Sequence, residues 1–279
     1  MSPFQHFPAP AKLNLFLHIT GRRADGYHLL QSVFRLIDFG DDIAIAVDDS
    51  GEICHENPLP GVPAESDLMV RAARLLQAHT GSRRGARLRI SKRLPMGGGL
   101  GGGSSDAATV LLALNHLWQT GLSRTELQQL GLQLGADVPV FIFGRDAFAE
   151  GVGEQLHAIT LPPRWYIVLI PPVSVPTAEI FSDPSLTRDT KPIIMAAFPN
   201  DGIRNDLENV AKKRYPVIAE YLEWLGQFGA AMMTGSGACV FAAFDTQEEA
   251  KRVMSFLPAT MQGFIAPSLM QHPLFDLAN

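Results

Sequence analysis

The spacing of apolar residues along the chain predicts a mixture of strands and helices. Alternating or continuous apolar runs predict strands over residues 11–19, 29–39, 43–47, 87–91, 147–153, 165–171 and 239–244, with a last strand near Phe264. Apolar residues at helical spacing predict helices over 68–79, 104–119, 123–134, 177–181, 205–228 with an interruption at Pro216, and 246–257. Residues 48–65, which hold several prolines, and residues 183–200 are predicted loops. This alternation indicates an α/β protein.

One stretch breaks the pattern. Residues 97–103 hold six glycines in seven positions, directly after the predicted strand over 87–91 and directly before the predicted helix over 104–119. Without β-carbons, the backbone N–H groups of such a loop can close around a ligand. The start of the following helix adds further free amides and a dipole that favours negative charge. A polyphosphate is the ligand that this arrangement suits best.

Several familiar phosphate loops do not fit this stretch. The glycine spacing formally matches a dinucleotide fingerprint, but the nearest acidic residue at the required distance, Glu126, is explained by a capping box with Ser123. No lysine follows the glycines, as a Walker loop requires. Residues 38–40 read Asp-Phe-Gly, but they precede the glycines and no His-Arg-Asp occurs. The stretch is therefore a flexible connector or a phosphate loop of another class.

Three further positions are candidates for chemistry. Lys12 and Asn14 share one face of the first predicted strand because side chains two residues apart in a strand point the same way. Asp137 lies between a predicted helix end and Pro139, where it serves either a turn or an active site. Residues 235–237, Gly-Ser-Gly, form a second tight glycine turn before a strand. Alone, Lys12 also fits a solvent-facing edge residue.

Length and charge restrict the function. The 279 residues allow one large or two medium domains, and 46% hydrophobic with 18% charged residues is ordinary for a globular enzyme. A net charge of −5, without a basic stripe, argues against a nucleic-acid partner. Cys54 and Cys239 are too few for a disulfide framework. We find no signal peptide and no apolar run of membrane-spanning length, so we expect a cytoplasmic protein without a membrane partner, as a monomer or weak homodimer.

Four stretches together resemble the GHMP superfamily of small-molecule kinases: residues 10–14, 95–105, 135–139 and 233–238. Residues 23–28, 115–118 and 175–177 with Phe181 resemble one branch, whose acceptor is a cytidyl diphosphate-linked methylerythritol of the non-mevalonate isoprenoid pathway. The resemblance implies a ribosomal-protein-S5-like N-terminal domain over 1–155 and an α/β sandwich over 156–279. It also implies an active site in the cleft between these domains and transfer of the ATP γ-phosphoryl group to the acceptor's 2-hydroxyl.

The resemblance also assigns residues to roles. Lys12 and Asp137 would be catalytic. Asp137 would take or orient the hydroxyl proton, and Lys12 would keep the Asp137 carboxylate ionised. The expected ATP-binding residues are Lys92, Pro95, Met96, Gly97, Gly98, Gly99, Leu100, Gly101, Gly102, Gly103, Ser104, Ser105, Asp106 and Asp67. The expected substrate-binding residues are Asn14, Tyr27, His28, Thr177, Phe181, Gly235, Ser236 and Gly237. Mg²⁺ would accompany ATP, with Ser105 as a candidate ligand.

Some assignments stay open at this level. Asp67 and Asp106 stand where the family often has asparagine, which leaves the adenine-side contacts unsettled. Lys92 also fits a solvated lysine, and Tyr27 and Phe181 also fit core packing. A homoserine- or mevalonate-type kinase, a related decarboxylase and a non-catalytic ligand-binding relative are the alternatives. Tyr27, His28 and Phe181 favour the cytidyl branch, since the other enzymes have no pyrimidine to stack.

Overall fold

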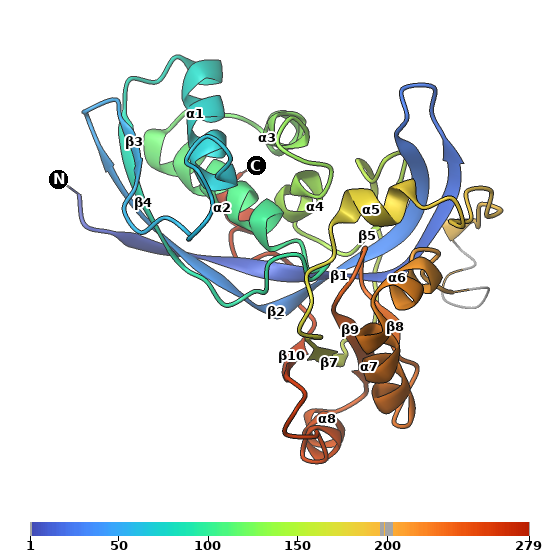
Figure 1. The fold of residues 1–279 in the computed structure, drawn as a ribbon. Coiled ribbons are helices and arrows are strands. Elements are labelled where there is room, and N and C mark those ends of the chain that lie inside the picture. The colour runs from blue at the N-terminus through green and yellow to red at the C-terminus, as the bar shows by residue number, and fades with distance from the viewer. Residues whose placement is uncertain (1, 196–197, 199–202, 279) are drawn as a thin grey trace.

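The computed structural model describes residues 2–195, 198 and 203–278, which form two β-sheets with helices packed on them. A long antiparallel pair, β1 (Gln5–Arg22) and β2 (His28–Asp48), runs across the molecule. Figure 1 shows helices α1 to α4 on one side of this pair and the second sheet with α7 and α8 on the other. The two-sheet arrangement of strands and helices confirms the predicted α/β class.

The first sheet has the order β3-β4-β2-β5-β6, with β1 paired to β2. Its other strands are β3 (Ile53–His55), β4 (Gly85–Ser91), β5 (Ala147–Glu150) and β6 (Gln155–Ala158). The helices packed with it are α1 (Leu68–Thr80), α2 (Gly102–Trp118), α3 (Arg124–Leu132) and α4 (Val138–Phe143). Residues 105–115 of α2 are buried throughout, so this helix forms the centre of the larger hydrophobic core.

The second sheet has the order β10-β7-β9-β8 and is antiparallel at each pairing. Its strands are β7 (Trp165–Leu169), β8 (Met232–Met233), β9 (Val240–Phe244) and β10 (Gly263–Pro267). The remaining helices are α5 (Thr177–Ser182), α6 (Glu208–Arg214), α7 (Pro216–Gly226), α8 (Gln247–Met254) and the 3₁₀ turn η2 (Phe275–Leu277). A separate core of apolar side chains stabilises this part of the chain.

The chain passes from the first sheet to the second between residues 158 and 165, after β6. The division predicted after residue 155 falls at the start of β6, which pairs with β5 in the first sheet, and it stays a prediction. The C-terminal residues return to the first unit, because Leu274 and Ala278 belong to its core and His272 N donates to Gly144 O at 2.8 Å.

The predicted elements differ from the structure mainly in the strands. The runs over 29–39 and 43–47 form one strand, because residues 40–42 stay paired with residues 8–10 of β1. The predicted loop over 48–65 contains β3. The predicted strand over 147–153 ends earlier and turns back into β6 through Gly151 and Gly153, both at positive φ. The helix over 205–228 is divided at Tyr215 and Pro216, as expected. The predicted loop over 183–200 lies partly outside the described residues.

Candidate active site

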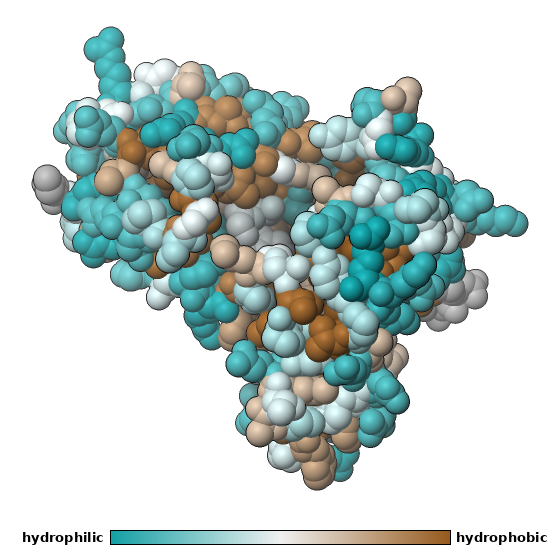
Figure 2. All heavy atoms as spheres, viewed as in Figure 1, coloured by the Kyte–Doolittle hydropathy of each residue, from teal (hydrophilic) through white to brown (hydrophobic). Residues whose placement is uncertain are grey.

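A cavity of about 910 Å³ lies between the two units. One wall comes from β1, the glycine loop, and the starts of α1 and α2, and the other from α5 and the turn at residues 235–236. Figure 2 shows this face hollowed between the α1–α2 region and the α5 region. All but two of the predicted site residues line this cavity; Ser105 and Gly237 do not.

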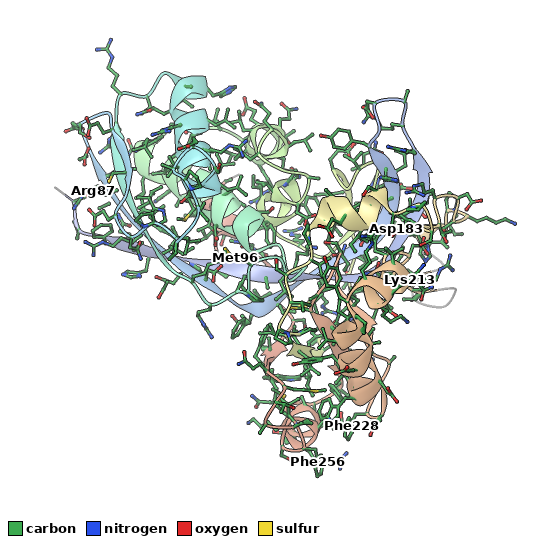
Figure 3. All side chains as sticks on the ribbon, viewed as in Figure 1. Arg87, Met96, Asp183, Lys213, Phe228 and Phe256 are labelled. Atoms are coloured by element: carbon green, nitrogen blue, oxygen red, sulfur yellow. The ribbon has the colours of Figure 1, made fainter. Side chains whose placement is uncertain are left out.

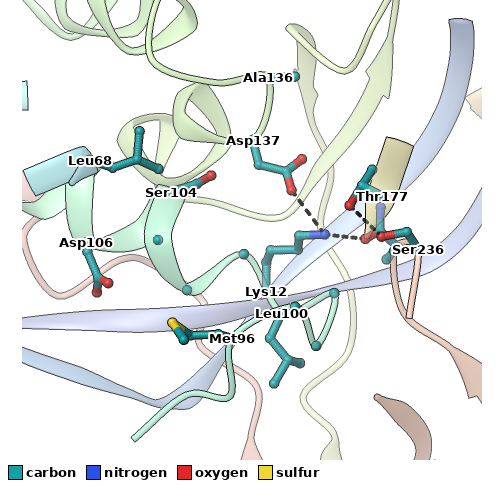
Figure 4. A pocket seen from close by; sticks show the side chains of 18 of the residues that line it. Lys12, Leu68, Met96, Leu100, Ser104, Asp106, Ala136, Asp137, Thr177 and Ser236 are labelled. Atoms are coloured by element: carbon teal, nitrogen blue, oxygen red, sulfur yellow. Dashed lines mark hydrogen bonds and ion pairs between the residues drawn. The ribbon is translucent and has the colours of Figure 1, made fainter. Parts of the chain in front are cut away.

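Lys12 is buried in β1, with 2% of its surface exposed. Its ammonium Nζ donates to Asn14 Oδ1 at 2.5 Å and lies 3.4 Å from Asp137 Oδ2 (Figure 4). The Asn14 amide nitrogen donates in turn to Ser32 Oγ at 2.8 Å. Lys12 is therefore not a solvent-facing edge residue: two neighbouring side chains hold its charge in one place.

Asp137 precedes α4, and the following proline suits the first turn of that helix. Its backbone is helical and its carboxylate makes no capping hydrogen bond, so the side chain is not committed to the turn. The carboxylate remains 38% exposed toward the cavity, whereas its partner Lys12 is 3% exposed. An anchored ammonium thus faces a carboxylate that a ligand can reach.

The glycine loop supplies backbone groups rather than side chains. Gly97, Gly99 and Gly101 have positive φ, a backbone conformation that other residues rarely adopt. The loop's carbonyls are occupied: the amide of Cys239 donates to Gly98 O at 3.1 Å, and that of Lys12 donates to Leu100 O at 3.0 Å. Within the described part of the chain, no hydrogen bond is donated by the amides from 97 to 104. These amides and the start of α2 are therefore free to bind an anion, and the predicted anion cradle stays a prediction.

The second glycine turn packs directly on the first. A β-carbon on Gly99 would lie 2.1 Å from Thr234 O, and one on Gly235 would lie 3.0 Å from Gly99 O. Gly235 and Ser236 line the cavity, whereas Gly237 does not. The buried amide of Asn205, which sequence reasoning missed, donates to Gly235 O at 2.7 Å. The two turns therefore form one interlocked unit.

Lys92 lies in a buried charge cluster. Its Nζ donates to Asp41 Oδ2 at 2.6 Å and to Asp106 Oδ2 at 2.8 Å. Burial acts to lower the pKa of Lys92, but the two carboxylates outweigh it and the pKa is raised. Burial raises the pKa of Asp106 to about 7 against the opposing effect of Lys92. Sequence reasoning missed Asp41, which also accepts from the amides of residues 93 and 94.

Asp67 is the N-cap of α1. Its carboxylate accepts from the amide of Met69 at 2.8 Å and is 2.7 Å from His55 Nδ1. Burial acts to raise the pKa of Asp67, but these hydrogen bonds prevail and the pKa is lowered. The carboxylate therefore stabilises the start of the helix beside the cavity.

The far end of the cavity carries aromatic side chains. The ring centres of His28 and Phe181 are 5.1 Å apart with their planes at 40°. Tyr27 is 64% exposed on the turn between β1 and β2, so it does not fill a core. The hydroxyls of Thr177 and Ser236 are 2.8 Å apart and link α5 to the second glycine turn (Figure 4).

The predicted metal ligand lies elsewhere. Ser105 is fully buried, its hydroxyl donates to Pro10 O at 2.7 Å, and it does not line the cavity. Ser104 lines the cavity instead, because successive side chains of a helix point about 100° apart. Among the described residues, no three His, Cys, Asp or Glu side chains gather as a metal site. None of the described helices is long and apolar enough to cross a membrane.

The N-terminal domain model of the GHMP kinases matches residues 67–145, and their C-terminal model matches residues 193–263. The chain is 61% identical over 272 residues to a 4-diphosphocytidyl-2-C-methyl-D-erythritol kinase of Thiobacillus denitrificans, covering 98% of each protein. It is 60% identical to one of Aromatoleum aromaticum, covering 96% of this chain and 94% of that protein.

Solved structures agree. A 4-(cytidine 5'-diphospho)-2C-methyl-D-erythritol kinase superposes with a TM-score of 0.82 at 33% identity, covering 95% of this chain and 99% of that one. A homoserine kinase from Cytophaga hutchinsonii superposes with a TM-score of 0.70 at 16% identity, over 98% of this chain and 96% of that one, which shows a shared fold. These matches confirm the predicted superfamily, its two-domain fold and the enzyme class, an ATP-dependent small-molecule kinase. The chain belongs to the 4-diphosphocytidyl-2-C-methyl-D-erythritol kinase family of the GHMP kinases.

Proposed function

We propose that this chain transfers the γ-phosphoryl group of ATP to the 2-hydroxyl of 4-diphosphocytidyl-2-C-methyl-D-erythritol, giving the 2-phosphate and ADP. The observation that carries the proposal is the 3.4 Å pair of Lys12 and Asp137, which faces the glycine loop across one cavity. The names of the relatives at about 60% identity supply the acceptor. The aromatic groups at the far end of the cavity suit its pyrimidine.

Phosphoryl transfer depends more on positioning and charge than on covalent chemistry. Asp137 is the group that accepts or orients the acceptor's 2-hydroxyl proton, because its carboxylate is open to the cavity. Lys12, 3.4 Å from that carboxylate, places a positive charge where negative charge develops in the transition state. Asn14 holds Lys12 in place, and since its side chain is already bonded on both sides, we assign it a positioning role.

The free amides between residues 97 and 104 and the start of α2 bind the β- and γ-phosphates. Lys92, Asp106 and Asp67 line the same part of the cavity, and we place the nucleoside of ATP beside them. Tyr27, His28 and Phe181 hold the cytosine at the other end. The hydroxyls of Thr177 and Ser236 lie between the two ends and bind the linking groups of the acceptor.

Mg²⁺ fits this site as a companion of ATP. Among the described residues, the Ser104 hydroxyl and the Asp137 carboxylate line the cavity near the loop and are the candidate protein ligands, whereas the Asp106 carboxylate there already pairs with Lys92. Phosphate oxygens and water would therefore supply most of the shell. When bound, the ion would neutralise phosphate charge.

Four further properties remain our predictions: a domain division near residue 155, a cytoplasmic location, a monomeric or weakly dimeric state, and the absence of a nucleic-acid partner.

The test is a coupled ADP assay of the purified protein with ATP, Mg²⁺ and one acceptor at a time: the cytidyl acceptor, mevalonate, homoserine or galactose. We expect turnover with the cytidyl acceptor alone, and ³¹P NMR of the product should show one new phosphomonoester with the diphosphate intact. Turnover of mevalonate or homoserine in its place would transfer the assignment to another kinase of the superfamily. ATP binding without turnover of any acceptor would indicate a non-catalytic relative.

A further inference from the structure

Arg188, in the stretch that follows α5, connects two of the side chains that we place around the acceptor's base. Its Nε donates to His28 Nε2 at 3.1 Å. One terminal nitrogen donates to the carbonyl oxygens of Phe181 and Asp183 at 3.1 and 2.7 Å, and the other to Leu186 O at 3.0 Å. Arg188 itself does not line the cavity, whereas His28 and Phe181 do. It therefore acts from behind the cavity wall.

The bond to His28 determines where the imidazole carries its proton. A guanidinium group only donates hydrogen bonds and stays charged at all ordinary pH values. Nε2 of His28 must therefore accept, which leaves the proton on Nδ1. Burial, followed by the charges of Arg188 and Arg22, lowers the pKa of His28, so the ring stays neutral. Within the described residues no hydrogen bond uses Nδ1, and this N–H is available to a ligand.

We propose that Arg188 is a positioning residue for the acceptor's pyrimidine, because it fixes His28 as an Nδ1–H donor and ties that imidazole to the backbone of Phe181. A cytosine ring carries a carbonyl oxygen and a ring nitrogen as acceptors, and a neutral Nδ1–H donor complements one of them. The same guanidinium sets the spacing of 5.1 Å between the His28 and Phe181 rings. The inference rests on the proposed function, since it takes the cytidyl end of the acceptor to bind here.

These contacts also fit a simpler role, because three of the four hydrogen bonds that Arg188 makes among the described residues go to backbone carbonyls of α5 and the loop after it. In that role the arginine would stabilise the loop without acting through His28. Arg214 provides a control for it: its guanidinium binds the Asp183 carboxylate at 2.6 and 2.7 Å in the same loop (Asp183 is labelled in Figure 3). No hydrogen bond within the described residues joins Arg214 to His28.

The test measures kcat and both KM values for Arg188→Met, Arg188→Lys and Arg214→Met. Arg188→Met should raise KM for the cytidyl acceptor about tenfold and leave kcat and KM for ATP within about twofold of wild type. Arg188→Lys keeps a charged donor and should recover part of the loss. Arg214→Met should leave the acceptor KM unchanged. If Arg214→Met and Arg188→Met raised KM for the cytidyl acceptor equally, Arg188 would only stabilise the loop, and the inference would be overturned.

A double-mutant cycle tests the route through His28. His28→Asn keeps an N–H donor near the Nδ1 position but lacks the Nε2 acceptor, so adding Arg188→Met should raise the acceptor KM by less than about twofold. A full tenfold effect in that background would overturn the inference.

Calorimetric titration of wild type with cytidine 5'-diphosphate separates the role of Arg188 from the proposed function. If wild type binds it and turns over the acceptor while Arg188→Met behaves as wild type, only the role of Arg188 fails; if wild type does neither, both fail.

Discussion

The two ends of the cavity are built in different ways. We assign one end to the phosphates of ATP and the other to the base of the acceptor. The phosphate end is backbone: glycines at positive φ, their carbonyls occupied and their amides free, are packed against a second glycine turn. The acceptor-base end consists of side chains from separate segments, and one of them, Tyr27, is 64% exposed. A substitution in the first region must therefore disturb the fold and the binding of ATP together. A substitution in the second should alter binding of the acceptor alone.

The Lys12 and Asp137 pair lies between these two ends and should give the largest effect. Asp137→Asn keeps the shape of the side chain but removes the carboxylate that we propose accepts or orients the hydroxyl proton, and Lys12→Met removes its charged partner. We expect either variant to lower kcat by about 10²–10⁴-fold, with ATP binding retained. Stopped-time ADP assays give kcat, and calorimetry gives the affinity for ATP. Asp49→Asn, which changes a carboxylate that is 98% exposed, is the control and should match wild type. A near-wild-type kcat for Asp137→Asn would remove the residue from the reaction.

The second prediction separates backbone strain from steric overlap at the phosphate end. Gly99 and Gly61 have nearly the same φ, 76° and 77°, but a β-carbon on Gly99 would lie 2.1 Å from Thr234 O while nothing lies within 4 Å of one on Gly61. Alanine at either position carries the cost of the left-handed backbone, about 1 kcal/mol. Gly99→Ala should lower the free energy of unfolding by roughly 2–3 kcal/mol more than Gly61→Ala, because the backbones must also separate.

Urea unfolding measures both free energies, and initial rates at varied ATP show whether the cradle is lost. KM for ATP should rise strongly in Gly99→Ala and remain unchanged in Gly61→Ala. Equal stability of the two variants would mean that the two glycine turns are not as tightly interlocked as their contacts indicate.

The same contrast explains what could be predicted from the sequence. The glycine loop, its flanking strand and helix, and the shared face of Lys12 and Asn14 are local patterns, and the structure contains each of them. Asp137 was identified as a candidate because the residues around it mark a helix boundary. The roles of these residues stay predictions until they are measured.

Other parts of the site depend on contacts between distant segments, which no local pattern reports. Asp41 reaches Lys92 across 51 positions, Asn205 reaches Gly235 across 30, and Arg188 reaches His28 across 160. The sequence also did not show which serine at the start of α2 faces the cavity. The helix begins at Gly102, two residues before the predicted start, and Ser104 rather than Ser105 lines the cavity. The short strand β3 lies in a proline-rich stretch that has no strand pattern of its own. It forms because it pairs with β4, a contact that the local sequence does not report.

The third prediction concerns the acceptor-base end. Phe181→Ala removes a ring against which a pyrimidine can stack, an interaction of about 1 kcal/mol, and should raise KM for the cytidyl acceptor about five- to tenfold with KM for ATP unchanged. Phe256→Ala is the control, since Phe256 is 62% exposed and lies at the tip of the second unit, far from the cavity (Figure 3). Steady-state kinetics at saturating ATP measure the change. If Phe181→Ala and Phe256→Ala have the same KM for the cytidyl acceptor, Phe181 does not belong to the base site.

The last effect is electrostatic, without a change in kcat, and concerns the Lys92 and Asp106 pair, beside which we place the nucleoside of ATP. The pKa of Asp106 is about 7 in the folded protein, against an ordinary value of 3.8. Between these values the folded state holds a proton that the unfolded chain has released, so the free energy of unfolding should fall as pH rises through this window and then level off. Lys92, whose pKa is raised, stays charged throughout and adds no slope there.

Asp106→Asn removes this titration while leaving Asp41 to pair with Lys92. The difference in the free energy of unfolding between Asp106→Asn and wild type should therefore shift in favour of the variant by about 2–3 kcal/mol from pH 5 to pH 8, measured by urea unfolding. Asp146, whose pKa is also raised, to about 6, is present in both proteins, so its contribution cancels in the difference. A difference that stays constant over this range would mean that Lys92 already holds Asp106 ionised at pH 5, and the cluster would then be a permanently charged wall rather than one that gains a negative charge near neutral pH.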